Sequence, residues 1–222
     1  MKSDRYVSIR RGLIALAMFF TFASPALAGG APAADTMGPV ELPGVSIKNF
    51  GVVDGRIYRG AQPKDEDFVA LKQLGVTTVV DLRLDARKGS RAEAEAAGLR
   101  YVNIRIDDRK QPTDADVVAF IALLDRSPDA KVYVHCAGGR HRTGSMVAVY
   151  RMVRNGWDVD RAYGEMKSYD FYTRNGHEGF KTYVFDYFER MLKDSQSVPV
   201  AAKAPSPAMV VDAAKGAAQG AK

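Results

Sequence analysis

The stretch VYVHCAGGRHRTG, residues 132–144, decides the fold because it joins three kinds of local structure in one short span. It opens on apolar residues typical of a buried strand, passes through a turn at Gly138 and Gly139, and continues into a helical pattern. A strand that runs through such a turn into a helix presents backbone N–H groups and a helix N-terminus to an anion. The stretch therefore predicts an anion-binding loop in an α/β protein.

Strand and helix patterns alternate on both sides of this loop. Apolar or alternating runs predict strands at 76–82, 100–106 and 131–134, after short extended segments around the turn dipeptide Asp54-Gly55. Helical spacing predicts helices at 65–74, 90–97, 114–124 with a cap at Thr113, 143–154, and a last helix with an apolar stripe from 180 to 192. We expect a single α/β domain with a mostly parallel central sheet flanked by helices.

The loop contains groups that suit phosphate. Gly138 and Gly139 allow backbone angles that turn successive N–H groups inward, and the planar guanidinium of Arg142 matches two phosphate oxygens. Cys136 is the only cysteine, and in this positive field its thiol should ionise below its usual pKa of ~8.5. We expect it to be a nucleophile for phosphorus. The expected substrate-binding residues are Ala137, Gly138, Gly139, Arg140, His141 and Arg142.

Several other kinds of site do not fit the sequence. A single cysteine excludes an internal disulfide and a four-cysteine zinc site. Gly139 and Gly144 have the spacing of a nucleotide-binding P-loop, but Ser145 stands where that motif needs lysine. Two of the three histidines flank a loop that must hold an anion, which does not favour a metal. We therefore expect neither a cofactor nor a metal.

The segment HCAGGRHRTG, residues 135–144, resembles the active-site signature of the cysteine-dependent protein tyrosine and dual-specificity phosphatases. That signature is His-Cys, five residues, then Arg and Ser or Thr. The resemblance extends over about 49–172 and includes RIYRGAQP at 56–63 and VVDLR at 79–83, which are similar to the small bacterial dual-specificity-like branch. The resemblance implies a phosphatase-like domain that hydrolyses phosphomonoesters.

The resemblance also implies roles for the residues that match the signature. Cys136 would attack phosphorus and form a phosphocysteine, while Arg142 would bind the equatorial oxygens. The hydroxyl of Thr143 would help the sulfur to leave, and His135 would support the loop and the thiolate.

The general acid of such an enzyme would be an aspartate on the loop after an upstream strand, and Asp107 and Asp108 are both candidates. Asp108 continues the inward parity of Val102, Ile104 and Ile106 and lies shortly before a proline, which favours it. Asp107 stays open as the acid or as a supporting residue. A further alternative is that both simply form the turn before the next helix.

Three functions remain open on these residues. The first is a phosphatase, acting on phosphotyrosine or phosphoserine proteins, inositol phosphates or phosphorylated lipid headgroups. The second is sulfur transfer of the rhodanese type, which the Arg-Thr-Gly ending of the loop and the upstream aspartates disfavour. The third is a module that binds phosphorylated ligands without turning them over. Surplus charge from Arg140 and His141 would favour a ligand that carries more than one phosphate.

Other polar residues have structural explanations. Asp81 and Arg83 end a strand and are expected to form an ion pair or loop anchor. Asp170, Arg174 and His177 fall in a polar loop that could border the substrate, although their spacing does not require it.

The formal net charge of +6 comes mostly from the ends of the chain. Residues 1–28 hold four Lys or Arg against one Asp, and residues 195–222 hold three Lys against one Asp, which leaves a net charge of +1 for the remainder. A generally basic nucleic-acid surface is therefore not expected.

The composition of the ends predicts the organisation of the chain. Basic residues, an apolar run and an Ala-x-Ala site make 1–28 a signal peptide, too short in its apolar part for a stable membrane anchor. We expect a flexible leader at 29–42, the catalytic domain at 43–194, and a disordered tail rich in Ala, Lys and Pro at 195–222. These features predict a periplasmic or secreted protein.

Cleavage after Ala28 should leave Gly29 as the first residue of the mature protein. N-terminal sequencing of protein from the extracytoplasmic fraction of a bacterial expression host tests this expectation. Full-length protein recovered in the membrane fraction would refute it.

Overall fold

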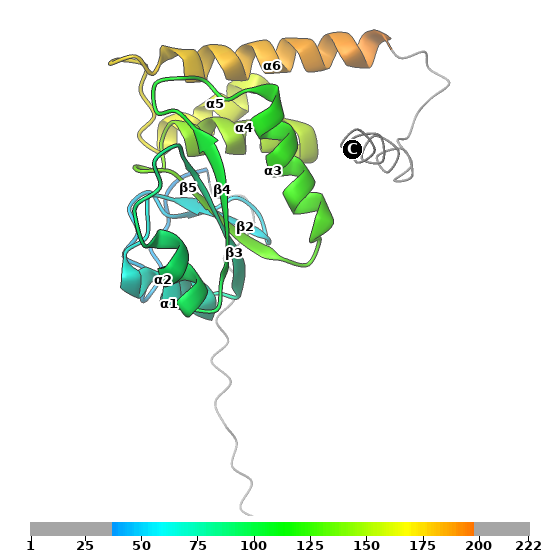
Figure 1. The fold of residues 1–222 in the computed structure, drawn as a ribbon. Coiled ribbons are helices and arrows are strands. Elements are labelled where there is room, and N and C mark those ends of the chain that lie inside the picture. Colours follow the sequence, from blue (N-terminus) through cyan, green and yellow to red (C-terminus); the bar gives the residue numbers. More distant parts are fainter. Residues whose placement is uncertain (1–36, 198–222) are drawn as a thin grey trace, which may run out of the picture. The chain divides into compact units, whose positions relative to one another are not determined.

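A five-stranded sheet lies between two layers of helices in the computed structural model, which describes residues 37–197 (Figure 1). The strands are β1 (Gly51–Val52), β2 (Ile57–Gly60), β3 (Val76–Arg83), β4 (Arg100–Ile106) and β5 (Lys131–His135). Their order in the sheet is β1-β2-β5-β3-β4, with β1 antiparallel to β2 and all other neighbours parallel. The predicted α/β fold with a mostly parallel central sheet is confirmed.

The helices cover both faces of this sheet. They are α1 (Asp65–Gln73), α2 (Ser90–Ala96), α3 (Asp114–Arg126), α4 (Arg142–Asn155), α5 (Val159–Ser168) and α6 (Glu178–Ser197). Figure 1 shows α1 and α2 together on one side of the sheet and α3 to α6 on the other. Strands covered on both faces need apolar residues at successive positions, as at 79–80 in β3 and at 132–134 in β5.

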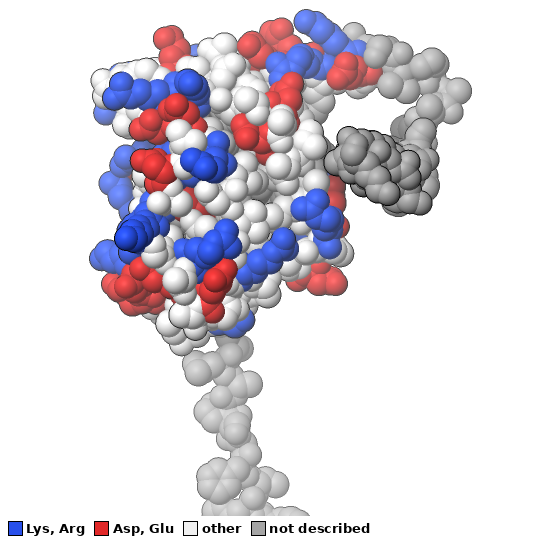
Figure 2. Space-filling view, viewed as in Figure 1, with Lys and Arg blue, Asp and Glu red and all other residues white. Residues whose placement is uncertain are grey.

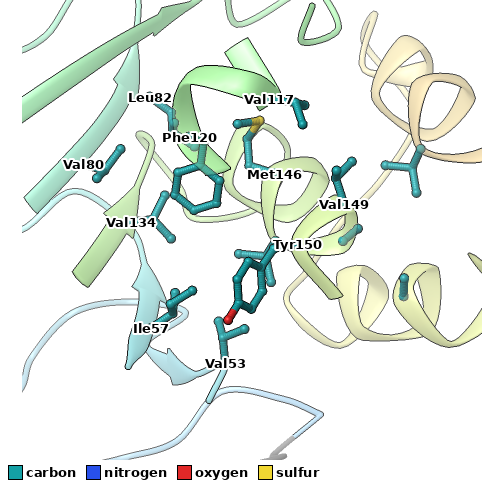
Figure 3. Close-up of a cluster of buried hydrophobic side chains, with 14 of the residues drawn as sticks. Val53, Ile57, Val80, Leu82, Val117, Phe120, Val134, Met146, Val149 and Tyr150 are labelled. Atoms are coloured by element: carbon teal, nitrogen blue, oxygen red, sulfur yellow. The ribbon is translucent and has the colours of Figure 1, made fainter. Parts of the chain in front are cut away.

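Alternate residues of each central strand enter two separate hydrophobic cores. Val80 and Val134 point toward α3 and α4, where they pack with Phe120 and Met146 (Figure 3). Their neighbours Val79 and Tyr133 belong to the second core, under α1 and α2. This period of two follows from the pleat of the strands.

Local signals in the sequence explain where two of the helices begin and end. The Thr113 hydroxyl accepts a hydrogen bond from the Asp116 N–H at 3.2 Å, and the Asp116 carboxylate accepts one from the Thr113 N–H at 2.8 Å, which completes a capping box at the start of α3. Helix α4 ends at Gly156, whose φ of 67° lies in the left-handed region.

The structure corrects both ends of the predicted domain. Residues 37–42 were expected to belong to a flexible leader, but Val40 and Leu42 pack against the second core, and the Val40 N–H donates to the Phe50 carbonyl at 2.8 Å. The apolar side chains of this segment fit the core, which its Pro- and Gly-rich composition did not indicate. Helix α6 runs to Ser197, beyond the predicted boundary at 194. The predicted signal peptide, residues 29–36 of the leader, and the tail from 198 lie outside the described residues.

Acidic and basic side chains are interspersed on the face shown in Figure 2, with no large area of a single sign. Within residues 37–197, no helix is long and apolar enough to cross a membrane.

Candidate active site

The loop after β5 lies where the carboxyl ends of the parallel strands meet. β5 pairs with β2 on one side and β3 on the other, so the loop from Cys136 to His141 emerges between two neighbouring strand ends. Arg142 is the first residue of α4, so the N-terminus of that helix lies directly after the loop. Ligand sites of open α/β sheets form at this edge.

A cavity of about 180 Å³ opens on this loop. Its lining residues are Asp108, Cys136, Ala137, Gly138, Arg140, His141, Arg142, Tyr172 and His177. A larger cavity of about 470 Å³ between α3 and α6 is lined by none of the predicted site residues, so its size does not make it the better candidate. The chemistry belongs to the smaller cavity, which brings together most of the predicted site residues.

The carbonyl oxygens of the loop are held from outside the cavity. The donors are the His135 ring to Cys136 (3.2 Å), the Gln62 N–H to Ala137 (3.2 Å), the Asn49 amide to Gly138 (2.9 Å) and the Arg59 guanidinium to Gly139 (2.9 Å). In a trans peptide the N–H points away from the preceding carbonyl oxygen. Carbonyls that point outward therefore leave the following N–H groups pointing inward, as an anion site requires.

Gly139 is the position where the loop needs glycine. Its φ of +70° lies in the left-handed region, and a Cβ there would lie 2.5 Å from the carbonyl carbon of Gly60. No L side chain fits this contact without moving the backbone of β2 or of the loop.

Cys136 is buried, with 3% of its surface exposed. Burial alone would raise the pKa of its thiol, but the Thr143 hydroxyl, the Arg142 charge and the N–H groups of Thr143 and Gly139 outweigh burial and lower the pKa below its ordinary value. The Thr143 hydroxyl has no hydrogen-bond partner among the described residues, so its proton can point toward the Cys136 sulfur. The site therefore stabilises the thiolate relative to that of an ordinary cysteine.

Arg142 is fixed from behind by the end of β4. Its Nη1 donates to the Ile106 carbonyl oxygen at 3.1 Å, and its side chain is almost fully buried. The same strand end leads directly to the two candidate aspartates, so one segment orients both the predicted phosphate ligand and the predicted acid.

Asp108 lines the cavity, whereas Asp107 does not. Asp107 accepts a hydrogen bond from the Arg109 N–H at 3.0 Å and lies 3.8 Å from the Lys110 ammonium. The Arg109 N–H lowers the pKa of the Asp107 carboxyl, with a further contribution from Lys110. Asp107 thus forms the turn, and Asp108 is the one of the two candidates that lines the cavity.

His135 is buried and neutral behind the nucleophile. Burial lowers the pKa of its ring to about 4 despite the nearby Asp81 carboxylate, whose oxygen lies 3.8 Å from His135 Nε2. Because a carbonyl only accepts, the His135 proton is on Nδ1, which donates to the Cys136 oxygen. Asp81 also binds Arg83, as predicted, and the Tyr101 hydroxyl at 2.6 Å.

The two basic residues of the loop differ from the expectation. Arg140 lies 3.5 Å from the Asp170 carboxylate of its own chain, so its charge is partly matched. Burial and the stacked His177 ring, 3.8 Å away between centroids, lower the pKa of His141 to about 4. The predicted positive charge on His141 is therefore wrong at neutral pH, because a sequence does not show how deeply a ring will be buried.

Sequence reasoning missed three residues that hold the loop: Asn49, Arg59 and Gln62. Arg59 and Gln62 lie in the segment 56–63, whose sequence indicated a resemblance to the phosphatase family but no contact with the loop. Nothing in the spacing linked Asn49 to the loop, because 89 positions separate it from Gly138. Of the polar residues at 170–177, His177 reaches the cavity wall together with Tyr172.

A cysteine side chain held among inward N–H groups, with an arginine at the start of the following helix, is typical of the cysteine-dependent phosphatases. Residues 48–182 match the model of the family described as DSP-PTPase phosphatase fused to NAD+ kinase, and the chain belongs to that family.

Characterised relatives in two organisms are similar to this chain. Over 134 residues the chain is 31% identical to the dual specificity protein phosphatase TpbA of Pseudomonas aeruginosa. The aligned region covers 58% of this chain and 57% of TpbA. Over 126 residues it is 25% identical to the inositol diphosphatase DSP4 of Arabidopsis thaliana, covering 54% of this chain and 63% of DSP4. The chain therefore spans less than two thirds of the length of either relative.

The fold agrees as well. The crystal structure of P. aeruginosa TpbA superimposes with a TM-score of 0.60 at 27% identity, over 76% of this chain and 99% of that one.

Gly139→Ala should damage the site more than the fold. The added Cβ must displace Gly60 or the loop, which would misdirect the N–H groups that stabilise the thiolate. We expect binding of inorganic phosphate, measured by calorimetry, to weaken by roughly 10-fold or more. Gly156→Ala is the matched control, because Gly156 also has a positive φ, of 67°, but a Cβ there would meet nothing within 4 Å, and it lies at the other end of α4 from the loop. Equal phosphate affinities for the two variants would contradict this reading of the loop.

Proposed function

We propose that this protein is an exported phosphomonoester hydrolase that works through a phosphocysteine intermediate. The observation that carries the proposal is the position of the Cys136 thiol in a cavity that it lines together with loop residues and Arg142, whose charge helps to lower the pKa of that thiol. Export rests on the sequence of residues 1–28 alone.

In the first step the substrate phosphate occupies the cavity, where the loop N–H groups and the Arg142 guanidinium bind its oxygens. The Cys136 sulfur attacks phosphorus as the bond from phosphorus to the leaving oxygen breaks. Asp108, in its protonated form, gives its proton to that oxygen, so the alcohol leaves neutral. The products of this step are the free alcohol and the phosphocysteine.

In the second step water attacks the phosphocysteine. Asp108, now a carboxylate, accepts a proton from the water as the bond from sulfur to phosphorus breaks. The Thr143 hydroxyl stabilises the departing thiolate by donating a hydrogen bond to it. Release of inorganic phosphate returns the site to its starting state.

The names of the relatives support two substrate classes, phosphorylated proteins and inositol phosphates. We propose that a phosphorylated substrate of one of these classes, or a phosphorylated lipid headgroup, occupies the site. Arg140 borders both the catalytic cavity and a shallower neighbouring cavity with Arg174, which supports a second negatively charged group on the substrate. The alternative of a non-catalytic phospho-ligand module would retain the cradle without turnover.

Cys136→Ser should abolish turnover and retain phosphate binding, because Arg142 and the loop N–H groups remain. Hydrolysis of a phosphomonoester panel, including phosphotyrosine peptide and inositol polyphosphates, should be undetectable for the variant, while calorimetry still detects inorganic phosphate. Wild-type activity should survive a chelator and disappear on thiol alkylation. A wild-type protein that binds the panel without hydrolysing it would favour the binding module instead.

Asp108→Ala should lower kcat by ~100-fold, the usual range for loss of a general acid. The loss should be much smaller for an aryl phosphate with an acidic leaving group, because such an oxygen needs no proton. Asp107→Ala is the matched control, since Asp107 lies outside the cavity and should change kcat by only a few-fold. The reverse order of the two variants would transfer the role of acid to Asp107.

Arg140→Ala should reduce the preference for a polyphosphorylated over a monophosphorylated substrate. A partly exposed charge contributes roughly 1 kcal/mol, which corresponds to a several-fold change in the ratio of kcat/KM values, and the change should shrink with added salt. Asp170→Asn should shift the ratio in the opposite direction, because it frees the Arg140 charge while asparagine still tolerates the positive φ of 60° at that position. Unchanged ratios in both variants would remove Arg140 from substrate selection.

A further inference from the structure

Two side chains from the first part of the domain reach the phosphate loop across the sheet. Asn49 Nδ2 donates to the Gly138 carbonyl oxygen, and Arg59 Nη2 donates to the Gly139 carbonyl oxygen, both at 2.9 Å. Neither side chain lines the cavity. Their exposed fractions are 8% for Asn49 and 0% for Arg59, so both are held where water cannot replace the hydrogen bond.

Asn49 adopts a strained conformation to make this contact. Its φ of 54° lies in the left-handed region, which few residues other than glycine occupy, although asparagine tolerates it better than most. Strain of this kind persists where the surrounding structure requires it, and it is concentrated at functional sites. Here the conformation is combined with a hydrogen bond to the loop.

The buried charge of Arg59 carries a free-energy cost of another kind. Its guanidinium is fully buried and lies 3.7 Å from the centre of the Tyr169 ring, and burial lowers its pKa against the opposing charge of Glu165. The Glu165 carboxylate is 3.9 Å away, too far for a hydrogen bond, and Nε and Nη1 of Arg59 have no hydrogen-bond partner among the described residues. Burying a charge with so few partners costs desolvation free energy that its contacts do not fully offset. Within residues 37–197, the one hydrogen bond that the Arg59 side chain donates goes to the loop.

The geometry of the peptide group connects these contacts to the chemistry. The Gly138 carbonyl and the Gly139 N–H belong to one trans peptide and point in opposite directions. When Asn49 holds the Gly138 oxygen outward, the Gly139 N–H points toward Cys136, where it helps to lower the pKa of the thiol. In the same way, Arg59 holds the Gly139 oxygen and so orients the N–H of Arg140.

We propose that Asn49 and Arg59 are positioning residues of the phosphatase site, acting through the carbonyls of Gly138 and Gly139. The inference rests on the proposed function, because the two residues serve catalysis only if the loop binds the phosphate of a substrate. It concerns binding of an oxyanion and ionisation of the thiol, which are measured without turnover.

Asn49→Gly tests the first contact with little disturbance of the backbone, because glycine keeps the left-handed conformation and removes only the amide. The pH midpoint of Cys136 alkylation by iodoacetamide should rise by roughly half to one pH unit. Binding of inorganic phosphate, measured by calorimetry, should weaken by roughly 5- to 10-fold. Asn175→Gly is the matched control, since Asn175 is also left-handed, with φ 62°, but lies on an exposed turn. It should change neither quantity.

Arg59→Met tests the second contact, and Arg151→Met is its control. Arg151 is also buried and donates to the same Glu165, at 3.1 and 2.7 Å, so both variants remove one positive charge from the same cluster. Both should lower the melting temperature. Arg59→Met should also weaken phosphate binding by roughly 10-fold or more, whereas Arg151→Met should weaken it by less than about 3-fold.

A purely structural role predicts a lower melting temperature with unchanged phosphate affinity and alkylation midpoint in both Arg59→Met and Asn49→Gly, and that result would overturn the proposal. Equal losses of phosphate affinity in Arg59→Met and Arg151→Met would also overturn the part assigned to Arg59, because the charge of the cluster would then explain the effect. If Arg59→Met does not fold, Asn49→Gly still decides the question. Wild-type protein that binds phosphate and shows a low pH midpoint of Cys136 alkylation but hydrolyses nothing would refute the proposed function and leave this inference intact.

Discussion

The peptide groups of the phosphate loop can point their N–H groups into one cavity only if other groups bind their carbonyl oxygens outside it. Buried backbone carbonyls need partners, and a loop cannot supply them from its own short length. Here four successive carbonyl oxygens each accept a hydrogen bond, at 2.9 to 3.2 Å. The donors are a histidine ring, a backbone N–H, a side-chain amide and a guanidinium. The arrangement also acts on the nucleophile, because the N–H of Gly139, which belongs to one of these peptides, helps the Thr143 hydroxyl and Arg142 to lower the pKa of the Cys136 thiol.

The sheet order explains how these partners reach the loop. Placing β5 between β2 and β3 puts its carboxyl end beside two strands that come much earlier in the chain. β2 contributes Arg59 directly, and the end of β3 contributes Asp81, which lies against His135. β4, at the edge of the sheet, ends at Ile106, whose carbonyl oxygen orients Arg142. The hydrogen bonds that Arg59 and Arg142 donate are buried, so they are made with little competition from water.

Burial disfavours the charged forms of Cys136, His135 and His141, but neighbouring groups outweigh it only at Cys136. It opposes the thiolate of Cys136, yet several donors and Arg142 outweigh it. It keeps His135 neutral, and with the stacked His177 it does the same for His141. The positive charge that faces a ligand therefore comes from arginines, of which Arg142 is held by a backbone carbonyl and Arg140 is partly matched by Asp170. An arginine keeps its charge where a buried histidine does not.

The sequence by itself determined the features that act over a few residues. Periodicity located the strands and helices, Thr113 and Asp116 marked the start of α3, and the spacing from Cys136 to Arg142 indicated the nucleophile and its phosphate ligand. Strand parity also favoured Asp108, which lies in the cavity. Only the tertiary structure decided that Asn49 and Arg59 hold the loop, that His141 is uncharged, and that residues 37–42 belong to the packed domain. The reason is physical: desolvation and contacts between residues far apart in the chain depend on how the layers pack, which no local pattern records.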